Sequence, residues 1–130
     1  MALRSPTYLA GAFMLLAIPF LIYFNLAVRL DPGAALFRFN HLVETGAEAR
    51  AAPHGERALT LLQREGQSEE ELSSLMLRVA HAQLARQKHG RVAELLRAAL
   101  ATKASEKLSK RQRADYEDML ARSAIQSGDI

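Results

Sequence analysis

The pattern of apolar residues divides the chain into two parts. Residues 8–28 form an apolar run without a charged side chain, whereas the later residues repeat apolar positions at intervals of three and four. The first pattern is typical of a membrane-spanning helix, because such a run is about 30 Å long as a helix and matches the hydrocarbon layer. The second is typical of packed amphipathic helices. We therefore expect an all-α protein, with a tail and transmembrane helix over residues 1–30 and a helical domain over residues 31–130.

The apolar run has the features of a retained signal anchor. It is longer than the apolar region of a cleaved signal peptide and ends without a small-x-small cleavage site. Pro19 predicts a kink or a helix-packing site, and Asn25 either reaches the headgroups or bonds to a partner helix. Basic residues after the run favour a cytoplasmic domain, but a short tail with one arginine, Arg4, is typical of an N-in anchor. We expect the N-in arrangement, with the domain outside the cytoplasm.

Beyond residue 31 the pattern predicts five helices and no strand. Asp31-Pro32 should end the first helix and begin the next, since proline suits a first helical position. That next helix is expected from Ala34 to about Ala51. Pro53-His54-Gly55 is predicted to separate it from a shorter helix that stops at Gly66.

Capping signals mark the later helices. Residues 68–71 and 109–112 each place a serine three positions before Glu or Gln, which is the spacing of a capping box. The helix after the first box should end with Gly90 in the left-handed conformation, and the next helix follows at once. So short a turn predicts an antiparallel helical hairpin. A polar link over residues 102–107 precedes the last helix, which should stop near Gly128.

Residues 90–100 carry a resemblance to a known class of repeats. Gly90-Arg91, followed by the sequence AELLRAAL at residues 93–100, resembles the turn and second helix of a tetratricopeptide (TPR) repeat. Residues 56–62, ERALTLL, resemble the second helix of an earlier unit, about 34–37 residues away, which is close to the repeat period. The resemblance implies a concave groove that docks proteins, without catalysis, as in membrane-anchored TPR accessory proteins of bacterial envelopes.

Composition and motifs exclude several kinds of chemistry. The chain contains no cysteine, which excludes disulfides, thiolate catalysis and cysteine-based zinc sites. Its 4 histidines form no recognised metal motif, and the sequence has neither a phosphate-binding glycine loop nor a nucleophile elbow. We therefore expect no enzyme activity, no cofactor, no metal and no small-molecule substrate. More arginine than lysine, with abundant alanine, is typical of GC-rich bacterial genomes and suggests a bacterial inner membrane.

Basic residues gather in the last third of the chain. The candidate patch consists of Arg91, Arg97, Lys103, Lys107, Lys110, Arg111 and Arg113. Such a patch would bind anionic lipid headgroups or an acidic partner, or it would be a solvated face balanced by acidic residues across the bundle. Nucleic acid is not an expected partner, because the segment has no aromatic residue for base stacking.

These features predict a single-span scaffold or assembly factor that acts at the membrane surface and holds another membrane or membrane-associated protein. The candidate partner contacts are Gln83 and Arg86 in the predicted groove, together with Pro19 and Asn25 in the span. The alternative is a small accessory subunit of a respiratory or photosynthetic membrane complex, held mainly through its transmembrane helix.

Overall fold

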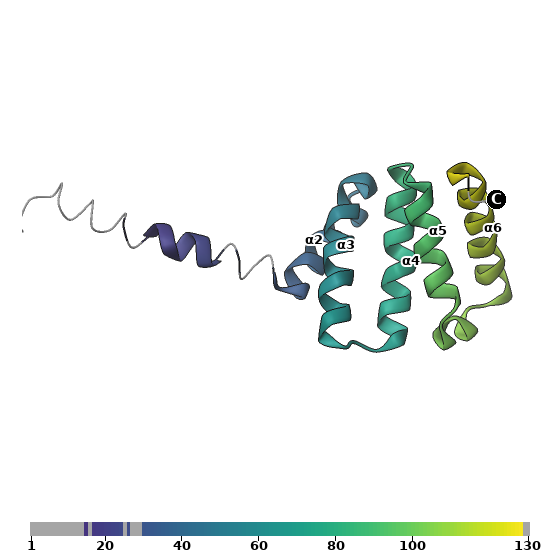
Figure 1. The fold of residues 1–130 in the computed structure, drawn as a ribbon, viewed down its shortest axis with the longest axis horizontal. Coiled ribbons are helices and arrows are strands. Elements are labelled where there is room, and N and C mark those ends of the chain that lie inside the picture. The colour runs from purple at the N-terminus through teal and green to yellow at the C-terminus, as the bar shows by residue number, and fades with distance from the viewer. Residues whose placement is uncertain (1–14, 16, 25, 27–29, 129–130) are drawn as a thin grey trace, which may run out of the picture. The chain divides into compact units, whose positions relative to one another are not determined.

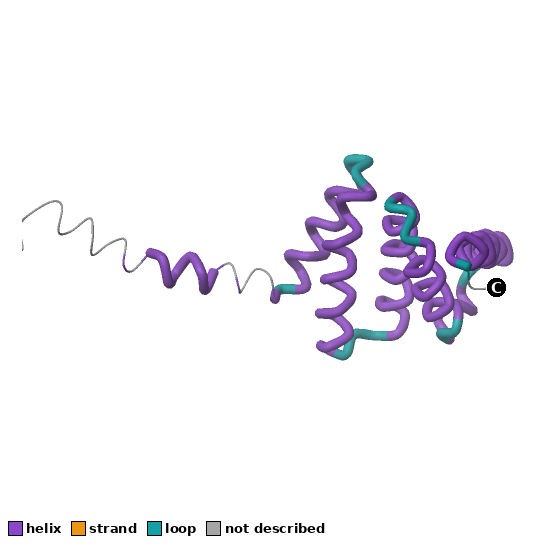
Figure 2. The backbone as a smooth tube through the Cα atoms, turned by 45° about the horizontal axis from the view of Figure 1, so that its top comes forward, coloured by secondary structure: helices purple, strands orange, loops and turns teal. Residues whose placement is uncertain are grey.

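A computed structural model describes residues 15, 17–24, 26 and 30–128 of the chain. In this part of the chain every regular element is a helix, which confirms the all-α prediction (Figure 2). The chain divides into two compact units, Met1–Asp31 and Pro32–Ile130. The α-helices that follow residue 31 all belong to the second unit.

The predicted transmembrane helix is wrong. Among the described residues, no helix has both the length and the apolar character needed to cross a bilayer. The expected single-pass localisation is contradicted by the same finding. Pro19 is helical and exposed, and Asn25 lies outside the described residues.

The second unit is a row of antiparallel helices (Figure 1). In chain order they are α2 (Pro32–Glu44), α3 (Glu48–Glu65), α4 (Glu69–Ala85), α5 (His89–Leu100), the 3₁₀-helix η2 (Lys103–Lys107) and α6 (Lys110–Ser127). Each α-helix packs mainly against the α-helices that precede and follow it in the chain. The predicted antiparallel hairpin over the middle of the domain is confirmed as α4 and α5 (Figure 2).

The first hairpin turns at a place that the sequence pattern did not predict. α2 ends at Glu44, and Gly46 adopts a φ of +81° in the turn before α3. The helix expected from residue 34 to 51 is therefore two helices, and the break expected at residues 53–55 lies inside α3. Pro53 falls in the second turn of α3, where its missing N–H removes one backbone bond without ending the helix.

Gly55 is a packing residue rather than a turn residue. A Cβ atom at this position would lie 2.7 Å from Cε2 of Phe39 and 2.8 Å from Cγ2 of Val79. Phe39 belongs to α2 and Val79 to α4, and neither side chain is exposed to solvent. The absence of a side chain on α3 thus lets the backbones of three helices approach closely at this point.

The capping signals of the sequence correspond closely to the structure. The box at the start of α6 is complete: Gln112 N donates to Ser109 Oγ at 3.1 Å, and Ser109 N donates to Gln112 Oε1 at 3.0 Å. At the start of α4, Ser68 Oγ accepts from Glu71 N at 3.3 Å. Serine hydroxyls therefore satisfy helical N–H groups that would otherwise lack a partner.

Two glycines confirm the predicted helix ends and a third does not. Gly66 and Gly128 close α3 and α6 in the left-handed conformation, as expected. Gly90 instead lies within α5, and the positive φ in the preceding turn, 58°, belongs to Gln87. The turn between α4 and α5 therefore ends α4 earlier than the glycine signal indicated.

Aliphatic side chains build most of the core. Its largest fully buried apolar side chains are Phe39 on α2, Val79 on α4, and Val92 and Leu96 on α5. Many of the remaining positions are alanine, which permits close helix packing. Burial of this apolar surface, rather than helix propensity alone, supplies most of the stability of such short helices.

Candidate functional site

A polar network connects three successive helices. On α3, the Glu56 carboxylate accepts two bonds from Arg91 on α5, at 2.9 Å to Nε and 2.7 Å to Nη2. Gln83 on α4 donates its Nε2 to the same carboxylate at 3.2 Å. A bidentate arginine–carboxylate pair fixes both distance and orientation. The network therefore links α3 directly to α5, and Gln83 links α4 to the same carboxylate.

The charged side chains of this network, Arg91 and Glu56, form an ion pair that is partly shielded from solvent. The Arg91 and Glu56 side chains are 39% and 27% exposed. The hydrogen bond from Glu56 raises the pKa of Arg91, with a second contribution from Glu94, whereas burial lowers it. The raised pKa keeps Arg91 charged near neutral pH, where its ion pair with Glu56 supports the fold.

The structure places Gln83 and Arg86, the predicted partner contacts, in different environments. The Gln83 side chain is only 5% exposed and belongs to the Glu56 network. Arg86 is exposed and follows the last residue of α4. One of these residues is therefore internal, and the other lies at a helix end.

Several members of the predicted basic patch have acidic neighbours. Lys107 Nζ lies 3.0 Å from Glu70, and Arg113 Nε lies 3.2 Å from Glu117. The backbone N–H of Lys103 donates to Glu69 at 2.7 Å. The other patch residues on the last helix, Lys110 and Arg111, are exposed, as is Arg97 on α5. Glu70 and Glu117 thus balance part of the patch, in keeping with the solvated-face alternative.

The exposed side of α4 is the best-formed candidate surface. Glu70, Ser74, Arg78 and His81 are all exposed and follow one another at helical spacing. We name these four side chains the α4 face. The sequence pattern indicates which residues form this face, because they lie between the buried positions of the same amphipathic helix.

Three hollows open beside the α4 face. The largest, of about 690 Å³, lies among residues of α2, α3 and α4. A second, of about 290 Å³, lies among α4, η2 and α6, and a third, of about 300 Å³, includes residues of α2 and α3 beside α4. Arg78 lines all three, and Ser74 and Glu70 line the first two. The α4 face is thus bordered by openings on both sides.

Contacts from the neighbouring helices position the α4 face. The Arg78 guanidinium lies 5.2 Å from the centroid of the Phe39 ring and donates to the side-chain oxygen of Asn40. His81 meets the Tyr116 ring of α6 edge-on, with centroids 6.0 Å apart. These contacts hold Arg78 between α2 and α4, while leaving further guanidinium donors for a ligand oxygen.

A separate hollow of about 440 Å³ lies between α6 and the turn after α4. Ser123 and His89 line it, and each has a buried polar side-chain atom without a hydrogen-bond partner among the described residues. Asp118, on the same wall, pairs with Arg122 at 3.1 Å. Ser123 Oγ and His89 Nδ1 are not hydrogen-bonded to each other, so the two residues do not form a catalytic pair.

The comparisons assign no family to the chain. Neither protein-family models, nor curated proteins, nor solved structures gave a match. In the described part of the chain, no group of three His, Asp or Glu residues is placed to hold a metal ion. The resemblance of residues 90–100 to TPR repeats stays a prediction from the sequence.

Proposed function

We propose that the helical domain is a protein-interaction module, and that it binds an extended segment of a partner protein along the α4 face. The observation that carries this proposal is that one residue, Arg78, lines hollows on both sides of α4. A ligand that crosses α4 would occupy more than one hollow and pass over the same guanidinium. An extended peptide has the narrow, continuous shape that such a path requires.

The chemistry of the α4 face suits a peptide backbone. Ser74 supplies both a donor and an acceptor, and Arg78 supplies donors for carbonyl or carboxylate oxygens. Apolar side chains in the hollows, such as Leu36 and Leu77, offer contacts for partner side chains. TPR-like hairpins would present such a face, so the proposed family and the proposed function agree.

The accessory-subunit alternative rested on a transmembrane helix as its main contact. Because that helix is contradicted, we do not pursue the alternative. The domain is proposed as a scaffold or assembly factor through its helical surface alone.

Cross-linking tests the proposed face directly. A photo-reactive amino acid placed at Ser74 in the full chain should cross-link a protein partner in cells, and mass spectrometry would identify it. The same group at Ala98, an exposed position on α5 outside the hollows described above, is the control. The purified partner should then bind Ser74→Trp at least about tenfold more weakly than wild type, since the indole would obstruct the hollows that Ser74 lines. Equal binding by Ser74→Trp and wild type would refute the proposal.

A further inference from the structure

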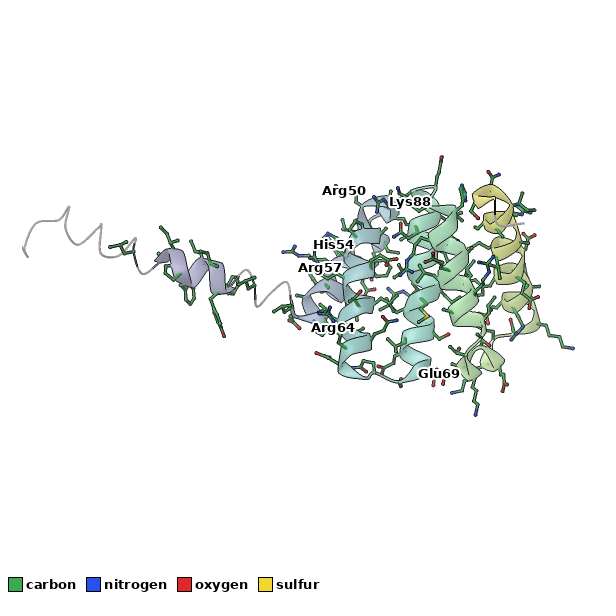
Figure 3. All side chains as sticks on the ribbon, viewed as in Figure 1. Arg50, His54, Arg57, Arg64, Glu69 and Lys88 are labelled. Carbon is green, nitrogen blue, oxygen red and sulfur yellow. The ribbon has the colours of Figure 1, made fainter. Side chains whose placement is uncertain are left out.

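A second surface runs along α3 and has a regular spacing. Arg50, His54, Arg57, Leu61 and Arg64 are separated by four, three, four and three residues. We name these five residues the α3 stripe. In Figure 3 the four labelled members, Arg50, His54, Arg57 and Arg64, follow one another along α3. Alternating spacings of three and four residues place these side chains on one side of the helix, as in one helix of a coiled coil.

The α3 stripe is positively charged, and no acidic side chain forms an ion pair with its arginines among the described residues. Its three arginines are exposed. Glu56, a nearby acid of α3, lies on another side of the helix and is engaged by Arg91. Glu65 flanks only the last arginine.

His54 reports the positive field of this region. Its pKa is lowered, first by burial and then by the charges of Arg57 and of Arg38 on α2. Arg38 therefore adds a fourth guanidinium close to the stripe. Two helices contribute positive charge to the same surface, which strengthens attraction for an anionic partner.

We propose that the α3 stripe docks an amphipathic helix of a partner protein that carries acidic residues at every seventh position. Arginines at 50, 57 and 64 repeat about every 10.5 Å along α3. A partner helix with the same seven-residue repeat would place one carboxylate opposite each guanidinium, and each pair could be bidentate. Leu61 continues the same spacing but is buried, with 9% of its surface exposed, so the exposed arginines carry the proposed contact.

A second copy of this chain does not fit the stripe. No two of its 14 acidic residues are separated by seven positions, so none of its helices presents the complementary repeat. Nucleic acid fits less well than a helix, because the stripe contains no Phe, Tyr or Trp for base stacking. The stripe shares no residue with the α4 face, so this inference stands or falls independently of the proposed function.

Binding of designed helices to the full-length protein tests the proposal. The probe is a labelled synthetic helix of about three heptads with glutamate at every seventh position. A second peptide has the same composition in scrambled order, and a third has arginine in place of each glutamate. We expect the first peptide to bind at least about tenfold more tightly than the scrambled one in fluorescence anisotropy. Equal affinity for both would overturn the proposed register.

Charge reversal locates the interaction. The triple variant Arg50→Glu, Arg57→Glu and Arg64→Glu should lose at least about thirtyfold in affinity for the glutamate peptide and gain affinity for the arginine peptide. The control variant, Lys88→Glu with Lys110→Glu and Arg111→Glu, changes the net charge equally at exposed positions elsewhere. It should change the affinity by less than about threefold. Circular dichroism verifies that both variants remain folded.

Two outcomes would overturn the helix partner. Equal loss in the control variant would show that net charge alone attracts the peptide. Tighter binding of a DNA duplex than of the glutamate peptide, abolished by the stripe variant, would make the stripe a nucleic-acid surface instead. Should the stripe variant fail to fold, the comparison of ordered and scrambled peptides on the wild-type protein still decides the proposal.

Discussion

The packing around Gly55 predicts opposite effects for one chemical change at two glycines. Both Gly55 and Gly90 lie in α-helices without a positive φ, so alanine improves helix propensity at each by up to about 1 kcal/mol. At Gly90 the new methyl group would meet only Ser127, at 4.0 Å, which is an ordinary contact. Gly90→Ala should therefore leave the free energy of unfolding unchanged or raise it.

At Gly55 the methyl group has no space. It would lie less than 3 Å from two atoms of the Phe39 ring and from one methyl carbon of Val79, and both side chains are 0% exposed. Overpacking of this kind destabilises by about 1–3 kcal/mol, and two rigid, fully buried neighbours place Gly55→Ala at the upper end. After the propensity gain, we expect a net loss of about 2 kcal/mol.

Urea unfolding followed by circular dichroism measures the difference. With a slope of about 2 kcal/mol per molar urea, Gly55→Ala should lower the midpoint by about 1 M. Adding Val79→Ala should partly relieve the clash. The double variant should then lose less free energy of unfolding than the sum of the losses in the two single variants. Unfolding free energies of Gly55→Ala and Gly90→Ala within 1 kcal/mol of each other would refute the close-packing argument, since only the contacts distinguish the two sites.

Four further predictions concern polar groups. The double-mutant cycle of Glu56→Gln and Arg91→Met should give a coupling of about 1 kcal/mol, reduced from that of a buried pair by partial exposure. Because burial, Arg57 and Arg38 lower the pKa of His54 in the folded chain, the unfolded chain binds the proton first as pH falls through 6.5, and stability decreases there. Ser109→Ala removes the capping box of α6 and should cost about 1 kcal/mol in urea unfolding. Ser123→Ala deletes a buried hydroxyl without a partner and should leave stability unchanged or raise it by up to about 1 kcal/mol.

Each of these has a clear contrary result. Additive effects at Glu56 and Arg91 would show that the pair contributes no interaction energy. A pH profile of stability that is the same in wild type and His54→Gln would remove His54 as its source. A Ser109→Ala variant as stable as wild type, or a Ser123→Ala variant destabilised by more than about 1 kcal/mol, would contradict the hydrogen bonding described for each serine.

The parts of the fold that depend on neighbouring residues were predictable from the sequence. The capping box at Ser109 and the helix stop at Gly66 need only a few adjacent residues, and both predictions are confirmed. The turn at Gly46 was missed because helical spacing of apolar residues continues across it. Pro53 and Gly55 predict a break because these residue types usually end helices, whereas the contacts that retain Gly55 in α3 come from two other helices.

The candidate site was less predictable for a related reason. Periodicity identifies an apolar side of α4, but α3 and α5 both pack against this helix and cover more of it than one stripe. Gln83 therefore becomes internal, and the exposed positions between Leu72 and Leu84 are those of Ser74, Arg78 and His81. The hollows beside them require α2, η2 and α6, whose placement no local pattern specifies.

The link between Glu56 and Arg91 has a consequence for how the domain opens. In a row of helices that contact mainly their neighbours, the ends can open while the middle stays intact. A bond from α3 to α5 makes the release of either helix dependent on the other, with α4 held between them. Amide hydrogen exchange should accordingly be slowest, and most uniform, across α3, α4 and α5, with α2 and α6 exchanging through separate, lower-energy openings. The surface that we propose for peptide binding would then belong to the last part of the domain to unfold.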